Sequence, residues 1–375
     1  MAIDSALLVE LSDAALAADY TRVRRCIGKL AAALEADGDA VAAAALRARS
    51  RSRGAPLRAS GYVETLPVDG KSRLPLLEEQ PAATQPIFLN AANSAAFRDF
   101  VEDAQHATSL SEKGISSKLC LLLSGPPGSG KSLLASHVAS QLHRAFYVVR
   151  LDSAISSLLG DTAKNVRAIF DFVPKKGAVL FLDEMDAIAK VRDDKHELGE
   201  VKRVVNTVLQ GLDALDHEAV VIAATNHPHL LDTAIWRRFP YKIELGLPDV
   251  DVRQALWSHF LFEDKPTGAA LAPQMAKMSG GLSGADIETI SHAARRHALI
   301  EKREIDFGAV AYAIQHSKTG KPTLPPRIAL NREQLHSVIT ALAKEDLKSA
   351  DIGRLIGITR QAVRYHLNQV STDGE

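Results

Sequence analysis

Short apolar runs alternate with amphipathic stretches through the middle of the chain. The runs stand at 119–123, 146–149, 178–182, 219–223 and 241–245, and the segments between them have apolar residues at helical spacing. Continuous apolar runs of this length are typical of strands buried on both faces. Strands that alternate with helices predict a parallel sheet with helices on both of its faces. The fold class predicted for residues 87–248 is therefore α/β.

Both ends of the chain have a helical pattern instead. Residues 1–52 are rich in Ala and Leu and predict a small helical domain that either docks a partner or packs on its own chain. Arginines and then prolines mark 53–86 as a linker. A second proline-rich linker is predicted at 319–331, and a further helical domain at 332–375.

A phosphate-binding loop is predicted directly after the apolar run at 119–123. Residues 125–132 fit the pattern Gly-x-x-x-x-Gly-Lys-Ser, whose glycines let successive backbone N–H groups point at one anion. Lys131 would reach the terminal phosphates, Ser132 would hold Mg²⁺, and the N-terminus of the following helix would add to the attraction. The nucleotide-binding residues expected here are Gly125, Pro126, Pro127, Gly128, Ser129, Gly130, Lys131, Ser132 and Leu133.

Polar and charged residues also follow two later predicted strands, those at 178–182 and 219–223. Asp183 and Glu184 end the run at 178–182, at the strand edge where ligands bind in such sheets. Asp183 would help to hold Mg²⁺, and Glu184 would polarise the attacking water. Asn226 follows the run at 219–223 and is placed to contact the γ-phosphate or the water. Arg237 and Arg238 could neutralise charge on the transferred phosphoryl group, although an arginine pair alone would suggest a surface salt bridge.

These motifs, in this order and spacing, make residues 87–318 resemble the AAA ATPases. The resemblance is to the branch that contains katanin, spastin and the ATPase part of membrane-bound AAA proteases. It implies that 125–132 is the Walker A motif, that Asp183 and Glu184 form Walker B, and that Asn226 is sensor 1. It also implies that Arg237 and Arg238 are arginine fingers that act on ATP bound by the neighbouring subunit of a hexameric ring. Cofactors implied are ATP and Mg²⁺.

The resemblance extends to a helical lid at 249–318. Gly284 and Ala285 would approach the nucleotide base and sugar, and Ser283 with Asp286 forms a helix-start capping pattern. The loop that grips a translocating polypeptide in the family carries an aromatic residue, which Leu158 replaces here. Leu158 and Leu159 are the expected pore contacts with a protein substrate.

The last domain resembles a helix-turn-helix at 350–367. Small Gly353 would let its two helices cross closely, Gly357 would form the turn, and Thr359 would start the second helix. The exposed side of that helix would carry Arg360, Gln361, Arg364 and Tyr365, residue types that contact phosphates and base edges. Three-helix domains also mediate protein contacts, so both a DNA partner and a protein partner stay open.

Composition limits the possible partners and the cellular location of the protein. The chain has 375 residues, and 45 Lys and Arg balance 45 Asp and Glu, so a nucleic acid would have to be met by a local patch. Cys26 and Cys120 lie far apart and provide neither a disulfide framework nor a zinc motif. No apolar run reaches the length of a membrane helix, and acidic residues interrupt the N-terminal segment. We expect a cytoplasmic protein.

The sequence thus favours an oligomeric ATPase that remodels a protein or protein–DNA substrate. The alternative is a DNA-binding regulator that ATP controls, with no polymer drawn through a pore. No His-Glu-x-x-His sequence is present, so a protease would be a separate partner. An ATP-binding scaffold without turnover is disfavoured by the presence of Glu184, Arg237 and Arg238.

Overall fold

The computed structural model describes residues 20–36, 42–44, 66–69, 75–81, 83–115, 117–150, 162–173, 177–186, 198–345 and 347–370. The chain forms two compact units, Met1–Leu66 and Pro67–Glu375. In the first unit, helix α2 (Tyr20–Ala36) buries Cys26, Leu30 and Ala31. Apart from α2 and a helical segment at 42–44, the helical domain predicted for 1–52 lies outside the described residues.

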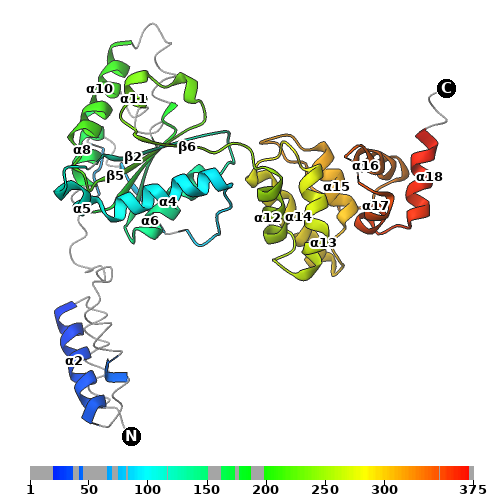
Figure 1. Ribbon diagram of the computed structural model, residues 1–375, viewed down its shortest axis with the longest axis horizontal. Helices are drawn as coiled ribbons and strands as arrows, with labels where there is room; N and C mark the ends of the chain where they lie inside the picture. The colour runs from blue at the N-terminus through cyan, green and yellow to red at the C-terminus, as the bar shows by residue number, and fades with distance from the viewer. Residues whose placement is uncertain are drawn as a thin grey trace. The chain divides into compact units, whose positions relative to one another are not determined.

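The second unit is built on a six-stranded sheet, and five of its strands lie at the predicted apolar runs. Its strands are β1 (Glu78–Gln80), β2 (Leu119–Ser124), β3 (Phe146–Arg150), β4 (Val179–Asp183), β5 (Val220–Thr225) and β6 (Tyr241–Glu244). They lie in the order β1-β3-β4-β5-β2-β6 (Figure 1). All neighbours pair in parallel except β1, which runs antiparallel to β3. This edge strand lies in the segment predicted as a linker.

Alternate residues of the strands face opposite layers of helices, because successive side chains of a strand point to opposite faces. On one face, Leu121, Phe181 and Ile222 share a core with α4 (Ala91–Gln105) and α6 (Lys131–Gln141). The helices α8 (Thr162–Phe172) and α10 (Leu198–Ala214) lie on the other side of the sheet (Figure 1). The short helix α5 (Ala107–Glu112) follows α4.

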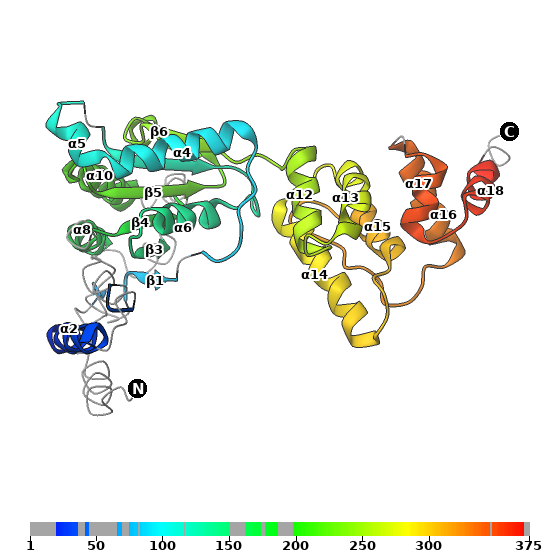
Figure 2. The same cartoon turned by 60° about the horizontal axis from the view of Figure 1, so that its bottom comes forward.

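The chain between β5 and β6 forms two short helical turns, η3 (Pro228–Leu230) and α11 (Thr233–Trp236). The sheet is then followed by helices alone (Figure 2). Those of the lid region are α12 (Val250–Phe260), α13 (Pro266–Met278), α14 (Gly284–Glu301) and α15 (Phe307–His316). The last three are α16 (Arg332–Lys344), α17 (Ser349–Ile356) and α18 (Arg360–Val370).

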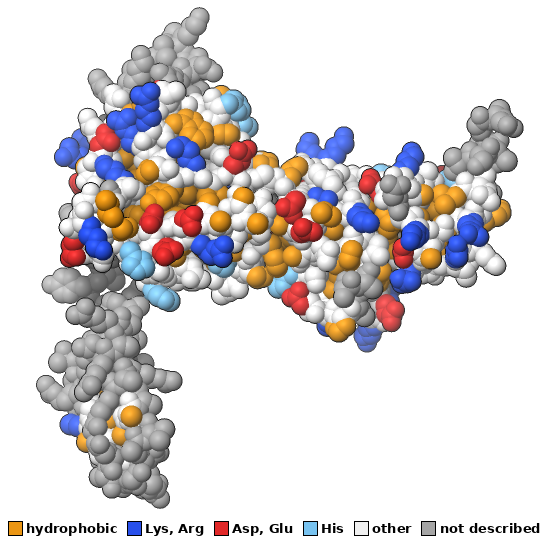
Figure 3. Space-filling model, in the orientation of Figure 1, with side chains coloured by type: hydrophobic (Ala, Val, Ile, Leu, Met, Phe, Trp, Pro, Cys, Tyr) orange, Lys and Arg blue, Asp and Glu red, His pale blue; other side chains and the backbone are white. Residues whose placement is uncertain are grey.

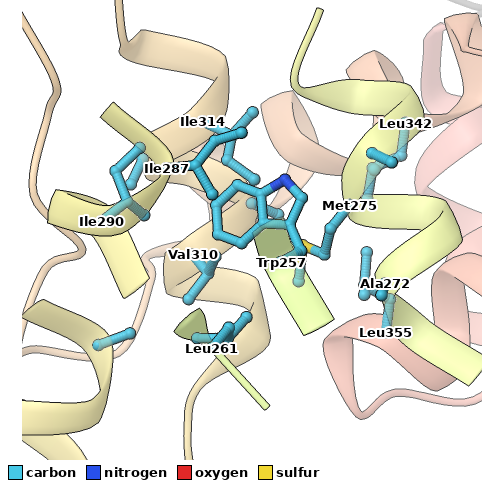
Figure 4. Packing of buried hydrophobic residues seen from close by; sticks show 14 of the residues in the cluster. Trp257, Leu261, Ala272, Met275, Ile287, Ile290, Val310, Ile314, Leu342 and Leu355 are labelled. Carbon is cyan, nitrogen blue, oxygen red and sulfur yellow. The ribbon is translucent and has the colours of Figure 1, made fainter. Parts of the chain in front are cut away.

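One apolar core fills the interior of these seven helices. Trp257 of α12 is fully buried and donates from its indole N–H to the hydroxyl of Ser279 at 2.9 Å. Figure 4 shows residues of α13, α14 and α15 around this ring, with Leu342 and Leu355 of the last three helices packed beside them. The segments predicted as a lid and as a separate C-terminal domain therefore share buried side chains.

The start of α14 is capped as the sequence pattern predicted. The Ser283 hydroxyl accepts from the backbone N–H of Asp286 at 3.2 Å, and the Asp286 carboxylate accepts from the backbone N–H of Ser283 at 2.9 Å. This reciprocal pair satisfies two donors that the first helical turn leaves without intrahelical partners. It fixes the point at which the lid approaches the loop between β2 and α6.

Candidate active site

The loop between β2 and α6 is tightly curled and depends on its glycines. Gly125, Gly128 and Gly130 have φ values of 149°, 75° and 93°, a range that side chains rarely adopt. A Cβ atom at Gly125 would lie 2.0 Å from the carbonyl oxygen of Leu245. A Cβ atom at Gly128 would lie 2.7 Å from the Ser283 hydroxyl oxygen. The loop is thus held between the end of β6 and the start of α14, and neither contact leaves room for a side chain.

Lys131 begins α6 and points back into this loop. Its ammonium group donates to the carbonyl oxygens of Gly125 at 2.8 Å and Pro126 at 3.0 Å. Burial lowers the pKa of Lys131, and the carboxylates of Asp183 and Asp186 oppose that shift. A cation stripped of water beside a helix N-terminus is well placed to bind a polyphosphate.

The two acids at the end of β4 have different surroundings. Asp183 is the last residue of the strand, and its carboxylate accepts from the backbone N–H of Glu184 at 2.9 Å. Glu184 has φ 55°, in the left-handed region that non-glycine residues seldom occupy. Such backbone strain is common in active sites, where surrounding structure maintains it.

A buried carboxylate that the sequence analysis did not single out supports Asn226. Asp186 is 3% exposed and accepts from the Thr225 hydroxyl at 3.1 Å and from the backbone N–H of Asn226 at 3.3 Å. The neighbouring backbone N–H of Met185 donates to Ala224 at 2.8 Å. These bonds tie the ends of β4 and β5 together. The sequence does show an acidic residue, Asp186, three positions after Asp183, but it does not show that this residue is buried.

A cavity of about 490 Å³ brings most of the predicted residues together. Those that line it are Pro127, Gly128, Ser129, Gly130, Lys131, Ser132, Leu133, Asp183, Glu184, Asn226, Gly284 and Ala285. Gly125 and Pro126 complete the loop beneath it. The lid closes one side, where the backbone N–H of Ala285 donates to the carbonyl of Gly128 at 3.2 Å. The walls also include Ile87, Phe88 and Phe260, which the motif search did not select.

The donor set of the cavity fits Mg²⁺. Ser132 and Asp183 both line it and offer a hydroxyl and a carboxylate oxygen, the hard ligands that this ion takes together with water and phosphate oxygens. Within the described residues, no group of three or more His, Cys, Asp or Glu side chains is placed to hold a metal ion. A metal here would thus depend on the nucleotide for part of its coordination.

The two adjacent arginines lie away from this cavity. Arg238 donates to both carboxylate oxygens of Asp213 in α10, at 3.2 and 3.1 Å, and to the carbonyl of Ala234 at 3.1 Å. The bond to Arg238 lowers the pKa of Asp213. Arg237 is exposed, and both arginines line a separate surface depression with Lys118. The structure therefore places both guanidinium groups outside the cavity of their own chain.

Two other sets of predicted residues are placed differently. Leu158 and Leu159, the expected pore contacts, lie outside the described residues. On α18, Arg360, Gln361 and Arg364 are exposed and Tyr365 is 56% exposed. Gly357 has φ 77° in the turn before α18, and the Thr359 hydroxyl accepts from the backbone N–H of Ala362 at 3.2 Å. No helix among the described residues is long and apolar enough to cross a membrane.

The fold and the cavity define a P-loop protein that binds and hydrolyses a nucleoside triphosphate, with the phosphate loop after β2 and acids at the end of β4. Residues 121–247 match the family model described as the ATPase family associated with various cellular activities (AAA). The chain is 36% identical to the AAA family ATPase y4kL of Sinorhizobium fredii over 249 residues. This match covers 64% of this chain and 74% of that protein. The chain therefore belongs to the AAA family and is an ATPase.

Other relatives and a solved structure agree with this assignment. The ATP-dependent zinc metalloprotease FtsH 3 of Sphaerobacter thermophilus is 36% identical over 64% of this chain and 50% of its own length. A spastin homolog of Caenorhabditis elegans is 33% identical over 50% of this chain and 37% of its own length. The crystal structure of the FIGL-1 AAA domain matches 72% of this chain and 92% of that chain, with TM-score 0.54 and 23% identity, and shows the fold. The chain thus spans half or less of the FtsH and spastin relatives.

Proposed function

We propose that this ATPase works as an oligomeric ring in which ATP hydrolysis remodels a protein or protein–DNA substrate. The observation that supports the proposal is that the expected catalytic residues lie in two separate places, some in the cavity and some on the surface. The cavity contains Lys131, Asp183, Glu184 and Asn226, whereas Arg237 lies outside it on the surface. Among the described residues no arginine lines the cavity, and in this proposal Arg237 from a second copy of the chain completes the site.

Each residue in the cavity has a chemical role in this proposal. The loop N–H groups and Lys131 bind the phosphates, and Ser132 and Asp183 would hold Mg²⁺, which would supply charge neutralisation for the transfer. Glu184 orients the attacking water, and Asn226 contacts the γ-phosphate or that water. Gly284 and Ala285 hold the base and sugar from the lid. Arg237 and Arg238 of the neighbouring subunit stabilise the charge that develops during transfer.

Complementation between two inactive variants tests the shared site. Glu184→Gln and Arg237→Ala should each lose ATPase activity when assayed alone. In an equal mixture, about a quarter of the interfaces of a head-to-tail ring pair an intact Glu184 with an intact Arg237. Recovery of activity in the mixture supports the proposal. No recovery, with assembly of mixed oligomers confirmed by pull-down of differently tagged chains, would overturn it.

Action on a protein substrate is supported by the similarity to an ATP-dependent zinc metalloprotease, and threading through the pore is our proposal for how that action occurs. In this proposal Leu158 and Leu159 contact the polypeptide, and any proteolysis is performed by a separate partner. Leu158→Ala should abolish unfolding of a tagged fluorescent substrate while ATPase activity persists. Unimpaired unfolding by this variant would favour a mechanism without threading at this loop.

The alternative function is an ATP-controlled DNA-binding regulator that uses a helix-turn-helix at α17 and α18. It is supported by the exposed face of α18. Residues 317–370 contain nine Lys and Arg against four Asp and Glu, but the predicted domain at 332–375 has six of each, so the excess comes from the segment that precedes it. Lys and Arg side chains are spread over this part of Figure 3. The double variant Arg360→Ala/Arg364→Ala should weaken duplex DNA binding and flatten its salt dependence by about two charges. Equal affinity of the variant and the parent would exclude this surface.

A further inference from the structure

The seven helices after the sheet share one continuous interior. From the lid region, Trp257, Met275, Val310 and Ile314 are each at most 4% exposed. The residues of the last three helices that are buried in the same cluster are Val338, Ile339, Leu342, Ile352, Leu355 and Val363, joined by Leu347 between α16 and α17. In Figure 4, Leu342 and Leu355 lie beside Met275 and Ala272 of α13. Side chains packed at the density of a protein interior do not slide past one another freely.

Specific contacts also connect the lid helices to the last three helices, in addition to the apolar packing. The Gln315 side chain of α15 donates to the Ser337 hydroxyl of α16 at 2.8 Å. A Cβ atom at Gly308 of α15 would lie 3.4 Å from the Cγ2 atom of Ile356 of α17, so the Ile356 side chain packs close to the α15 backbone. Arg303, just after α14, donates to the carbonyl of Arg327 in the connecting segment at 2.9 Å. The backbone N–H of Gly320 in the same segment donates to the Asp286 carboxylate of α14 at 3.2 Å, so the connecting segment is fastened to both ends of α14.

The same helical body reaches the nucleotide cavity through α14. The N-terminus of α14 contacts the phosphate loop, where Ala285 donates to Gly128 at 3.2 Å. Further along, Ile287, Ile290 and Ala294 of this helix are buried in the shared core. A helix of 18 residues rises about 27 Å. One continuous helix thus connects the phosphate loop with the packing that supports the last three helices.

We propose that α12–α18 moves as one rigid body, so that the nucleotide in the cavity sets the position of α18. The exposed face of α18 is then a surface whose presentation depends on ATP. Because coupling between two binding sites is reciprocal, duplex DNA on α18 would change ATP affinity by the same factor that ATP changes DNA affinity. The rigid body rests on the ATPase assignment alone, and the DNA coupling rests on the alternative function proposed above.

Distances between spin labels test the rigid body directly in the full-length chain. Labels go on introduced cysteines at three exposed positions, Arg98 in α4, Leu299 in α14 and Asn368 in α18. Both native cysteines are buried, and burial raises the pKa of the Cys120 thiol to about 12, so it stays protonated and unreactive. Dilution of labelled chains with unlabelled chains isolates distances within one subunit.

The expected result is that the Leu299–Asn368 distance distribution is the same without nucleotide, with ADP, and with ATP in a Glu184→Gln background. The distances from Arg98 to both other labels should shift together between these states. A Leu299–Asn368 distribution that shifts or broadens with nucleotide overturns the proposal. Fixed distances from Arg98 in all states overturn it too, because the body would then not respond to nucleotide.

A variant in the core shared by the lid and the last three helices, compared with a matched control, provides a second test. Leu342→Ala opens a cavity in the shared core from a residue that is fully buried, whereas Ile328→Ala removes a side chain that is 84% exposed. Leu342→Ala should broaden the Leu299–Asn368 distribution and weaken ATP binding by at least about threefold, and Ile328→Ala should do neither. Unchanged ATP affinity in a folded Leu342→Ala protein counts against the rigid connection.

DNA coupling is measured separately by titrating duplex DNA with and without ATP in the Glu184→Gln background. Typical coupling factors are about 5 to 150, and the converse titration of ATP should give the same factor. Equal DNA affinity in both states overturns the coupling. Absence of DNA binding in every state removes the alternative function, while the label distances still decide whether the helices move as one body.

Discussion

Replacement of Asp186 by alanine offers a sharp test of how the active site is held together. Asp186 is buried and accepts from the Thr225 hydroxyl and the backbone N–H of Asn226. In the Asp186→Ala protein the buried Thr225 hydroxyl and the partly buried backbone N–H of Asn226 both lose this acceptor. The Asn226 side chain, expected to contact the γ-phosphate, would no longer be fixed relative to β4. Asp186 is in this view a positioning residue for Asn226.

The size of the effect follows from the two lost bonds. A buried donor left without its partner costs about 1–3 kcal/mol, so two such donors should lower the free energy of unfolding by about 3 kcal/mol. Loss of one preorganised polar group aimed at the reacting phosphate lowers kcat by up to about a hundredfold. Asp186→Asn keeps the volume and a neutral acceptor, so its losses should be smaller in both respects.

Steady-state ATPase kinetics and a double-mutant cycle separate positioning from general destabilisation. Asp186→Ala should lower kcat about ten- to a hundredfold with ATP KM nearly unchanged, as should Asn226→Ala. Because both variants disable the same contact, the double variant should be no slower than the worse single one. Additive losses in the double variant, or a kcat within about threefold of the parent for Asp186→Ala, would refute the positioning role.

Three further outcomes are expected. Gly128→Ala places a Cβ atom on a residue with φ 75° and directs it at the Ser283 hydroxyl. The ATP affinity measured by calorimetry should therefore fall about tenfold. An unchanged affinity would contradict the close approach of the phosphate loop to the lid. Arg237→Ala should lower ATPase activity without changing the melting temperature, whereas Arg238→Ala should lower both, because Arg238 bonds to α10; equal melting of the two variants would argue against this difference. Burial, with a smaller contribution from nearby positive charges, lowers the pKa of His366 in the folded protein below 6.5. As the pH falls below about 7, the unfolded chain therefore binds this proton before the folded chain does, and the protein loses stability. His366→Phe should reduce the dependence of the melting temperature on pH between pH 5 and 8, and an unchanged dependence would show that His366 does not contribute.

The sheet and the phosphate loop were predictable because their signals are local. Each buried strand is a continuous apolar run, and the loop is recognised from eight consecutive residues whose glycines the backbone requires. Asp183, Glu184 and Asn226 follow from the same logic, since they stand where neighbouring parallel strands end. The capping pair at Ser283 and Asp286 is equally local, with a separation of three residues.

Features that depend on distant partners were not predictable from these patterns. The antiparallel strand β1 is three residues long, too short for any alternation to appear, and it is defined by its pairing with β3. Asp186 resembles a surface acid until Thr225 is placed beside it. Amphipathic patterns showed that the helices after the sheet have apolar faces, but they did not show that α15 and α16 bury theirs against each other.

The hydrogen bonds of Lys131 to its own loop bear on how products leave. When ADP departs, the ammonium group has two carbonyl acceptors at 2.8 and 3.0 Å in the same loop, so release does not leave a dehydrated cation without partners. Phosphate oxygens and these two carbonyl oxygens therefore compete for the same ammonium group. A phosphate that binds Lys131 must replace these two bonds, so the lysine adds less to ATP affinity than its charge alone would suggest.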